Sequence, residues 1–263
     1  MKTNKKLGVI LTSIGALVLI IGTFVIFMTW YEKAMHMETA EPGCELLLKW
    51  IMPALADLSI LAGVGFIVSA YGFFIKKDWA FPVAVFANVL GLQGSWFINV
   101  PFMAGGAPPI YFIVFWPTLI LYFLIMRLVG KLPWGRILLG MLTGMGFIFC
   151  FMNGIASWSR ILTIGDPIFV FVQRLSWFSS IGWGIVTIGI LIRPKEWMRI
   201  VGLGAGLLQV LVGVPLAYTT TIELGRFSLF TLAPLISLVI LVLFFSPSLY
   251  QRMTGSQDET SAA

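Results

Sequence analysis

Charged residues are scarce in this sequence. They make up 11% of the 263 residues, against roughly a quarter in an average soluble domain. Hydrophobic residues make up 59%, and the mean hydropathy is +0.98. A soluble core of this size cannot enclose so much apolar surface, so lipid must be the solvent for most of the chain. The net charge of +6 comes from short basic clusters between apolar runs, a pattern that indicates membrane orientation and not a nucleic-acid partner.

Histidine and cysteine are also rare. The single histidine, His36, excludes a haem b held by two axial histidines of one chain. The two cysteines, Cys44 in a polar segment and Cys150 in an apolar run, imply no disulfide framework. The sequence has no nucleophile elbow, HExxH motif, paired-carboxylate set or P-loop. No cofactor can be named from the residues, and an enzyme with a soluble-type active site is disfavoured.

Eight apolar runs are long enough to cross a bilayer core of roughly 30 Å, which needs ~20 helical residues. A backbone exposed to lipid must satisfy its own hydrogen bonds, and no barrel-type alternation occurs, so the sequence predicts an all-α polytopic transmembrane protein. The first run follows a basic start and lacks a small-x-small cleavage site, which predicts an uncleaved signal anchor. The predicted spans are 7–30, 51–75, 79–100, 110–126, 137–157, 167–192, 200–222 and 227–245.

Basic residues concentrate on one side of the predicted membrane. The longest segment on the other side, residues 31–50, carries four glutamates. The positive-inside rule then predicts a multi-pass cell (inner) membrane protein with both termini in the cytoplasm and residues 246–263 as a polar cytoplasmic tail. Twelve of the seventeen basic residues lie on the inner side: Lys2, Lys5, Lys6, Lys76, Lys77, Arg127, Lys131, Arg136, Arg193, Lys195, Arg199 and Arg252.

The second half of the chain resembles the first at a spacing of 117 positions. The aligned pairs are Leu58 with Leu175, Gly65 with Gly182, Gly72 with Gly189, Pro117 with Pro234 and, after one inserted residue, Asp78 and Trp79 with Glu196 and Trp197. Apolar helices resemble one another by composition, but the acidic-Trp turn and the prolines carry information that composition does not. The sequence predicts two parallel four-helix repeats, residues 1–130 and 131–245, related by a pseudo-twofold axis along the membrane normal.

Two ionisable residues lie at matching positions of these repeats. Asp57 and Arg174 are 117 positions apart, and each is predicted roughly 10 Å below the outer surface. Charges at that depth usually face a partner or a water-filled cavity. We therefore predict an ion pair between the halves, which is either structural or part of a ligand site. The alternative for Arg174 is that its long side chain extends to the outer headgroups.

Uncharged polar residues are predicted at similar depth. Taken singly, each is more often a contact between helices than a ligand site. Together with the charge pair, they suggest a polar chamber that opens outward and suits a charged or zwitterionic solute, a quinone headgroup or an ion. These residues are Gln93, Ser95, Asn153 and Gln173, with Asn88 and Gln209 nearer the midplane.

The long outer segment offers a weaker constellation of soft donors. Met35, His36, Met37 and Cys44 lie within ten positions, and thioether, imidazole and thiolate ligands select Cu(I). Methionine is common in this chain, with 12 residues. The grouping is therefore either a metal-binding site or a coincidence of composition.

Three functions are compatible with these features. The leading hypothesis is a transporter-like protein that handles a small solute, ion or lipid at a polar chamber between two four-helix halves. The second is a membrane anchor subunit of a redox, quinone-reactive or other complex, by analogy of architecture alone. The third is a membrane enzyme acting on lipid. The predicted partners are the lipid bilayer, a small solute or quinone, and partner subunits in the second case.

Overall fold

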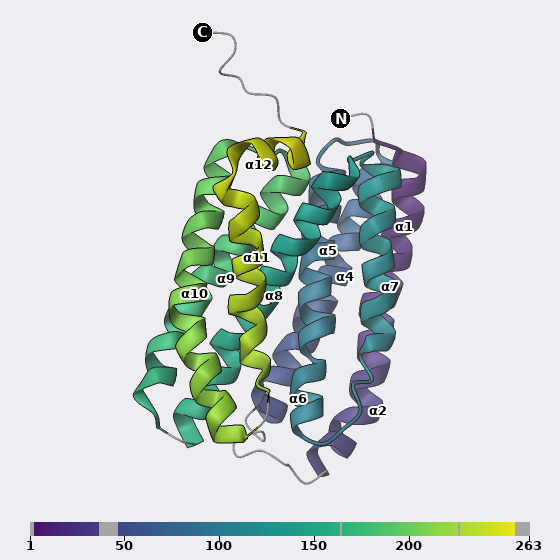
Figure 1. Cartoon of the computed structure of the whole chain (residues 1–263). Coiled ribbons are helices and arrows are strands. Elements are labelled where there is room, and N and C mark those ends of the chain that lie inside the picture. Colours follow the sequence, from purple (N-terminus) through teal and green to yellow (C-terminus); the bar gives the residue numbers. More distant parts are fainter. Residues whose placement is uncertain (1–2, 37–46, 164, 226, 256–263) are drawn as a thin grey trace. The chain divides into compact units, whose positions relative to one another are not determined.

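The computed structural model describes residues 3–36, 47–163, 165–225 and 227–255 (Figure 1). Within these residues the chain forms helices and turns, with no strand. Seven helical runs among them are long and apolar enough to cross a membrane, which confirms the prediction of an all-α, multi-pass membrane protein. These runs are Lys5–His36, Leu47–Phe74, Ala80–Ala104, Phe112–Val129, Trp134–Trp158, Pro167–Ile192 and Glu196–Glu223.

The last predicted span, 227–245, differs from the others. It is observed as Leu229–Phe245, which reaches the length of a span only together with α12 (Pro247–Thr254), and the two are bent by 96° relative to each other. The described residues therefore hold seven candidate spans, or eight if this bent pair counts as one. The bend occurs at Ser246, whose backbone is extended and whose hydroxyl accepts a hydrogen bond from Leu249 N at the start of α12.

Helix α12 forms the first part of the predicted polar tail. Its residue Tyr250 is buried, packs edge-on against Phe244 at a centroid distance of 5.3 Å and donates a hydrogen bond to the Lys195 carbonyl at 3.1 Å. Burial is the main cause that raises the pKa of Tyr250 to about 12, and the negative charge of Glu196 is the second. The phenol therefore stays protonated at neutral pH. These contacts bind the first residues of the predicted polar tail to the helices of unit 2.

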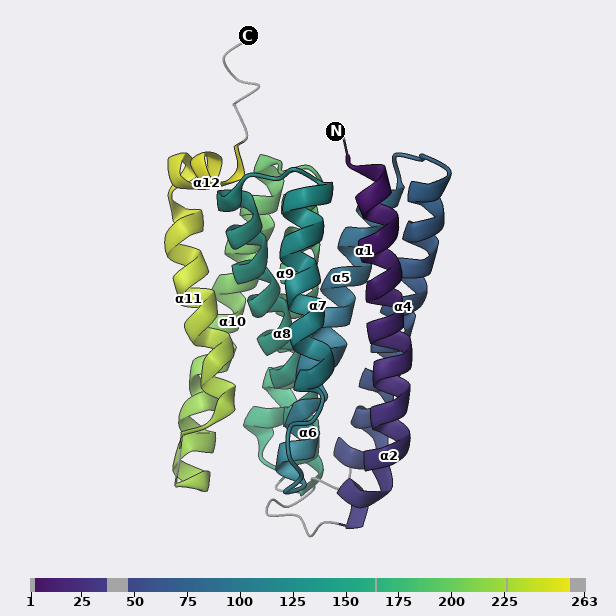
Figure 2. The ribbon, with the colours of Figure 1, turned by 90° about the vertical axis from the view of Figure 1, so that its right-hand side faces the viewer.

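The chain divides into two compact units, and unit 1 comprises Met1–Leu132. Its first helix is continuous from α1 through the π-helical turn η1 into α2, with α4 beside it (Figure 2). In the order α1, α4, α5 and α7, each helix packs against the next, and α7 returns to α1. The elements are α1 (Lys5–Leu17), η1 (Val18–Gly22), α2 (Thr23–His36), η2 (Leu47–Ile51), α4 (Met52–Phe74), α5 (Ala80–Phe97), α6 (Asn99–Ala104), α7 (Phe112–Leu124) and η3 (Ile125–Val129).

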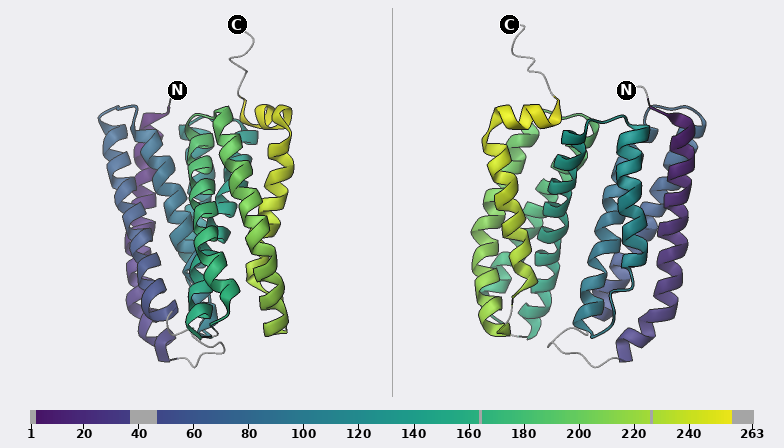
Figure 3. Two further views of the ribbon diagram at one scale, coloured as in Figure 1. Left: turned by 90° about the vertical axis from the view of Figure 1, so that its left-hand side faces the viewer. Right: turned by 45° about the vertical axis from the view of Figure 1, so that its right-hand side comes forward.

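Unit 2 comprises Pro133–Ala263 and has the same order of neighbours. Each of α8, α9, α10 and α11 packs against the next, and α11 returns to α8. The short helix α12, in yellow, lies across the end of α11 (Figure 3). The elements are α8 (Trp134–Thr163), α9 (Pro167–Ile192), α10 (Glu196–Leu224), η4 (Leu229–Thr231), α11 (Leu232–Phe245) and α12.

Basic side chains cap the carboxyl ends of two helices. In unit 2, Arg136 donates hydrogen bonds to the carbonyls of Ile190 at 2.5 Å and Leu191 at 3.0 Å, in the last turn of α9. In unit 1, Lys5 donates to the carbonyl of Lys76, just after α4. Cations are favourable there because the last carbonyls of a helix lack intrahelical donors and carry partial negative charge. The basic clusters seen in the sequence thus also terminate helices.

Local capping explains some of the agreement between predicted and observed span ends. The sixth span was predicted at 167–192 and is observed as Pro167–Ile192, because Asp166 accepts a hydrogen bond from Ile168 N at 2.9 Å and Pro167 begins the helix. The first span was predicted to end at residue 30, but its helix continues to His36. No capping or helix-breaking residue follows Trp30 directly. The predicted end relied only on the change from apolar to polar residues, and it was therefore placed too early.

Candidate functional site

The two predicted membrane charges lie at the surfaces of their own units. Asp57 on α4 and Arg174 on α9 are both exposed. Neither side chain forms an ion pair or a hydrogen bond with the described residues of its own unit. The Asp57–Arg174 pair therefore remains a prediction from the sequence.

The predicted amides of unit 1 do not form one cluster. Gln93 is buried, and neither of its amide atoms has a hydrogen-bond partner. Asn88 donates to the Thr118 carbonyl at 3.4 Å, and Ser95 bonds within its own helix. Because α5 turns by about 100° per residue, Gln93 projects from a different side of the helix than Asn88.

The predicted metal ligands are only partly described. Met35 and His36 are the last described residues of α2, half-buried and exposed respectively. Met37 and Cys44 lie outside the described residues. Among the residues that are described, no group of three or more His, Cys, Asp or Glu side chains could hold a metal ion. Metal binding by this segment remains a prediction.

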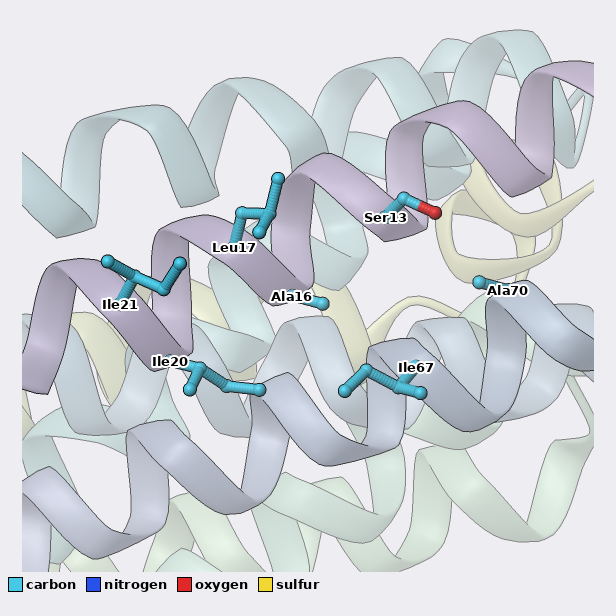
Figure 4. Close-up of a pocket in the computed structure, with 7 residues that line it drawn as sticks. All are labelled: Ser13, Ala16, Leu17, Ile20, Ile21, Ile67 and Ala70. Carbon is cyan, nitrogen blue, oxygen red and sulfur yellow. The ribbon is translucent and has the colours of Figure 1, made fainter.

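A surface groove lies between α1 and α4. It has a volume of about 380 Å³, and its lining is almost entirely apolar. Figure 4 shows five lining side chains on the first helix, with Ile67 and Ala70 on α4. Its residues Leu17, Ile21 and Ile67 are more than half exposed. The single polar side chain, Ser13, cannot provide acid–base or metal chemistry by itself.

A layer of polar side chains lies inside unit 2, one from each of its four long helices. Asn153 comes from α8, Ser176 from α9, Gln209 from α10 and Ser237 from α11. We call these four residues the polar layer, and all of them are 0% exposed. Five of their atoms have no hydrogen-bond partner: Asn153 Oδ1, Ser176 Oγ, Gln209 Oε1, Gln209 Nε2 and Ser237 Oγ. Buried polar atoms in proteins are nearly always paired, so each of these five atoms requires a physical explanation.

Contacts between α8 and α9 place Asn153 and Ser176 at one level. A Cβ added to Gly154 would lie 2.0 Å from Trp177 Cδ1, so α8 and α9 approach each other closely where these two residues meet. Asn153 directly precedes Gly154, and Ser176 directly precedes Trp177. Both side chains therefore enter the bundle beside the same crossing.

Contacts between α10 and α11 place the other two residues opposite each other. Two glycine contacts bracket the pair: Gly206 faces Leu241 and Gly213 faces Pro234. Gln209 lies between the two glycines of α10, and Ser237 lies between their two partners on α11. A Cβ on Gly213 would also lie 2.6 Å from Gln209 Nε2. The Gln209 amide thus lies against the first turns of α11.

Further polar contacts link the layer across the bundle. Ser179, one turn from Ser176, donates to the Ala205 carbonyl at 2.7 Å and contacts Cys150 Sγ at 3.5 Å. The Ser237 hydroxyl lies near the same sulfur but makes no hydrogen bond of normal length and angle. Cys150, Ser179 and Ser237 therefore bring α8, α9 and α11 together beside the layer.

Apolar residues lie on both sides of the polar layer. On the side toward α12, the buried Trp183 ring lies against three glycines and packs edge-on against Phe244 at 5.8 Å. On the other side is a cluster of five buried residues: Phe169, Val172, Val212, Leu216 and Phe230. We call this cluster of five residues the apolar plug. Asn153 Nδ2 donates to the Phe230 carbonyl at 3.1 Å, which connects the polar layer to the plug.

Sequence reasoning found only part of this layer. Asn153 and Gln209 were singled out, whereas Ser176 and Ser237 were not. Gln173, a predicted site residue, is half-buried and lies outside the layer. A usable signal was present on α9, where Ser176, Ser180 and Thr187 follow a helical spacing and share one buried face.

No family model, curated protein or solved structure matches this chain.

Proposed function

We propose that this integral membrane protein is transporter-like and handles a small solute. The observation that supports this proposal best is the polar layer, four buried side chains with five unpartnered atoms inside a bundle of apolar helices. The plug and Trp183 separate the layer from the two ends of unit 2. Alternating access requires a solute site between the two ends of a helix bundle, where each side can be closed in turn.

The energetic cost of the polar layer supports a functional reason for it. Each buried polar atom without a partner costs about 1–3 kcal/mol. Five such atoms cost an amount of the same order as the whole stability of a domain, about 5–15 kcal/mol. Lipid provides no hydrogen bonds to offset this cost. A bound molecule that pairs with these atoms would offset it, and apolar side chains at the same positions would avoid it.

The proposed function is tested by flux into liposomes that contain the purified chain, with protein-free liposomes as the reference. Faster equilibration of a small solute supports transport. Equal rates, together with co-purification of a peripheral protein, would favour the anchor-subunit function instead.

We also propose a cell (inner) membrane location with both termini in the cytoplasm. The basic residues of the sequence support this orientation. Reporter fusions after Lys76, Arg127 and Arg193 should read cytoplasmic, and a fusion after Gly106 should read external. Paired phosphatase and fluorescent-protein fusions measure both states. An external signal at Arg193 would contradict the orientation and the number of spans.

We further propose that units 1 and 2 are repeats of one ancestral four-helix unit. Three helix contacts occur at corresponding places. Gly65 faces Ala87 as Gly182 faces Ala205, Gly72 faces Ala80 as Gly189 faces Met198, and Gly15 faces Phe66 as Gly146 faces Trp183. The contact residues on α4 (Gly65, Phe66 and Gly72) and those on α9 (Gly182, Trp183 and Gly189) are 117 positions apart, as in the sequence alignment. Similar composition alone does not give the same pairs of contacting residues in both units. These contacts therefore support duplication in addition to the shared order in which the helices pack.

The Asp57–Arg174 ion pair remains part of this proposal. If the two charges contact each other between the halves, Asp57→Asn and Arg174→Gln should each lower thermal stability, and the double variant should recover part of the loss. Thermal unfolding of the three variants in detergent measures this coupling. Additive effects, or a silent Arg174→Gln, would contradict the pair and favour an arginine that extends to the headgroups.

A further inference from the structure

We propose that the polar layer of unit 2 is an occluded site for a small, uncharged molecule that both donates and accepts hydrogen bonds, such as water, glycerol or urea. This inference rests on the proposed function and names its substrate class. It locates the site inside one four-helix unit.

The free atoms of the layer include both donors and acceptors. Because Asn153 Nδ2 donates to the Phe230 carbonyl, Asn153 Oδ1 is left as an acceptor. Gln209 contributes one free NH2 donor group and one free carbonyl acceptor, and the two serine hydroxyls can do either. A ligand with only acceptors or only donors would leave some of these atoms unpaired. A hydroxyl, amide or water ligand would pair with both kinds.

The absence of charge near the layer disfavours an ion. Among the residues that the structure describes, no charged side chain of unit 2 is buried. Arg174 is exposed, and the described basic and acidic residues at the helix ends, such as Glu196 and Arg199, lie outside the core. An ion in the layer would lose its hydration without gaining a counter-charge, a cost that far exceeds that of a neutral molecule.

Among the described residues of unit 1, the positions that correspond to Gln209 and Ser237 hold no polar side chain, which argues that these two members of the layer are not a requirement of the bundle. At the corresponding positions, Ser59 replaces Ser176 and bonds to the Leu55 carbonyl at 3.1 Å. After the one inserted residue of the alignment, Gly91 replaces Gln209, and the Leu19 side chain fills the space beside it, 2.6 Å from an added Cβ. Ile120 replaces Ser237 and is 58% exposed. Unit 1 thus folds without a polar residue at the positions of Gln209 and Ser237, and its serine at the position of Ser176 is paired.

The experiment measures permeation in liposomes with stopped-flow light scattering for water, glycerol and urea, and with a sodium-sensitive dye for Na⁺. The wild type should pass at least one neutral probe faster than protein-free liposomes. Gln209→Leu and Ser237→Ala should each reduce that rate by about tenfold, the factor that corresponds to one net hydrogen bond. The control Thr221→Val, a half-buried threonine elsewhere on α10, should leave the rate unchanged. Thermal unfolding of each variant shows that it is folded.

The outcomes separate this inference from the proposed function. A neutral flux that Gln209→Leu and Ser237→Ala leave unchanged would overturn the site but leave transport standing, and a sodium flux without neutral flux would overturn the uncharged class. If no probe permeates, the proposed transport function is contradicted. The site is then judged by hydroxyl-radical footprinting, in which Cys150, buried beside the layer, is oxidised in the wild type if water occupies the layer. An unmodified Cys150 in that case would overturn the site.

Discussion

Replacing Trp183 by alanine should destabilise the protein by about 3–5 kcal/mol, the usual cost of removing a large aromatic side chain from a packed core. Trp183 is fully buried and lies within 3.3 Å of Cβ positions on Gly146, Gly202 and Gly206, from two neighbouring helices. These glycines have no side chains that could move into the space. The cavity would therefore remain, and α8, α10 and α11 would lose their common contact.

Chemical unfolding in mixed micelles measures the loss for Trp183→Ala. The matched control is Trp197→Ala, because Trp197 is a tryptophan of the same unit that is 46% exposed. This control should change the free energy of unfolding far less. Equal losses in the two variants would show that Trp183 does not organise the core of unit 2.

Leucine at Gly65 or Gly182 should destabilise each unit by about 1–3 kcal/mol, the range typical of overpacking. A Cβ at Gly65 would lie 3.0 Å from Ala87 Cβ, and a Cβ at Gly182 would lie 2.9 Å from Ala205 Cβ. The opposing atom in both cases is a short side chain on a helix and cannot move without the backbone. The two variants should therefore lose similar amounts of stability if the contacts are repeats of each other.

The control for both variants is Gly204→Leu. Gly204 lies on α10, next to Ala205, but an added Cβ would meet nothing within 4 Å. Thermal unfolding of the three variants should therefore show two similar losses and one small change. A silent Gly182→Leu beside a damaging Gly65→Leu would count against the repeat.

The membrane class and most spans could be predicted from the sequence because they depend on local properties. A helix needs only enough consecutive apolar residues to cross the bilayer, and each helix satisfies its own backbone hydrogen bonds. Where a local cap was present, as at Asp166 and Pro167, the helix begins at the predicted residue. Where only polarity marked the end, as after Trp30, the helix extends further.

Features that depend on distant contacts were not predictable. Helix α12 looked like part of a polar tail, because Tyr250 is buried only through its contacts with Phe244 and the Lys195 carbonyl. The π-helical turns, such as η1, were not predicted either. In an apolar helix of this kind, the residue types do not distinguish one extra residue per turn from a regular α-helix.

The sequence by itself determined that lipid surrounds most of this protein. It also determined the number of apolar runs and the residue pairs that are 117 positions apart. Which polar residues meet was decided only by the tertiary structure. Ser176 and Ser237 are ordinary serines in apolar helices, and serine in such a helix normally bonds to its own backbone. Their significance arises because α9 and α11 bring them to the level of Gln209 and Asn153, with Trp183 on one side and the apolar plug on the other. Helix rotation and depth set that level, and both depend on contacts between residues far apart in the chain.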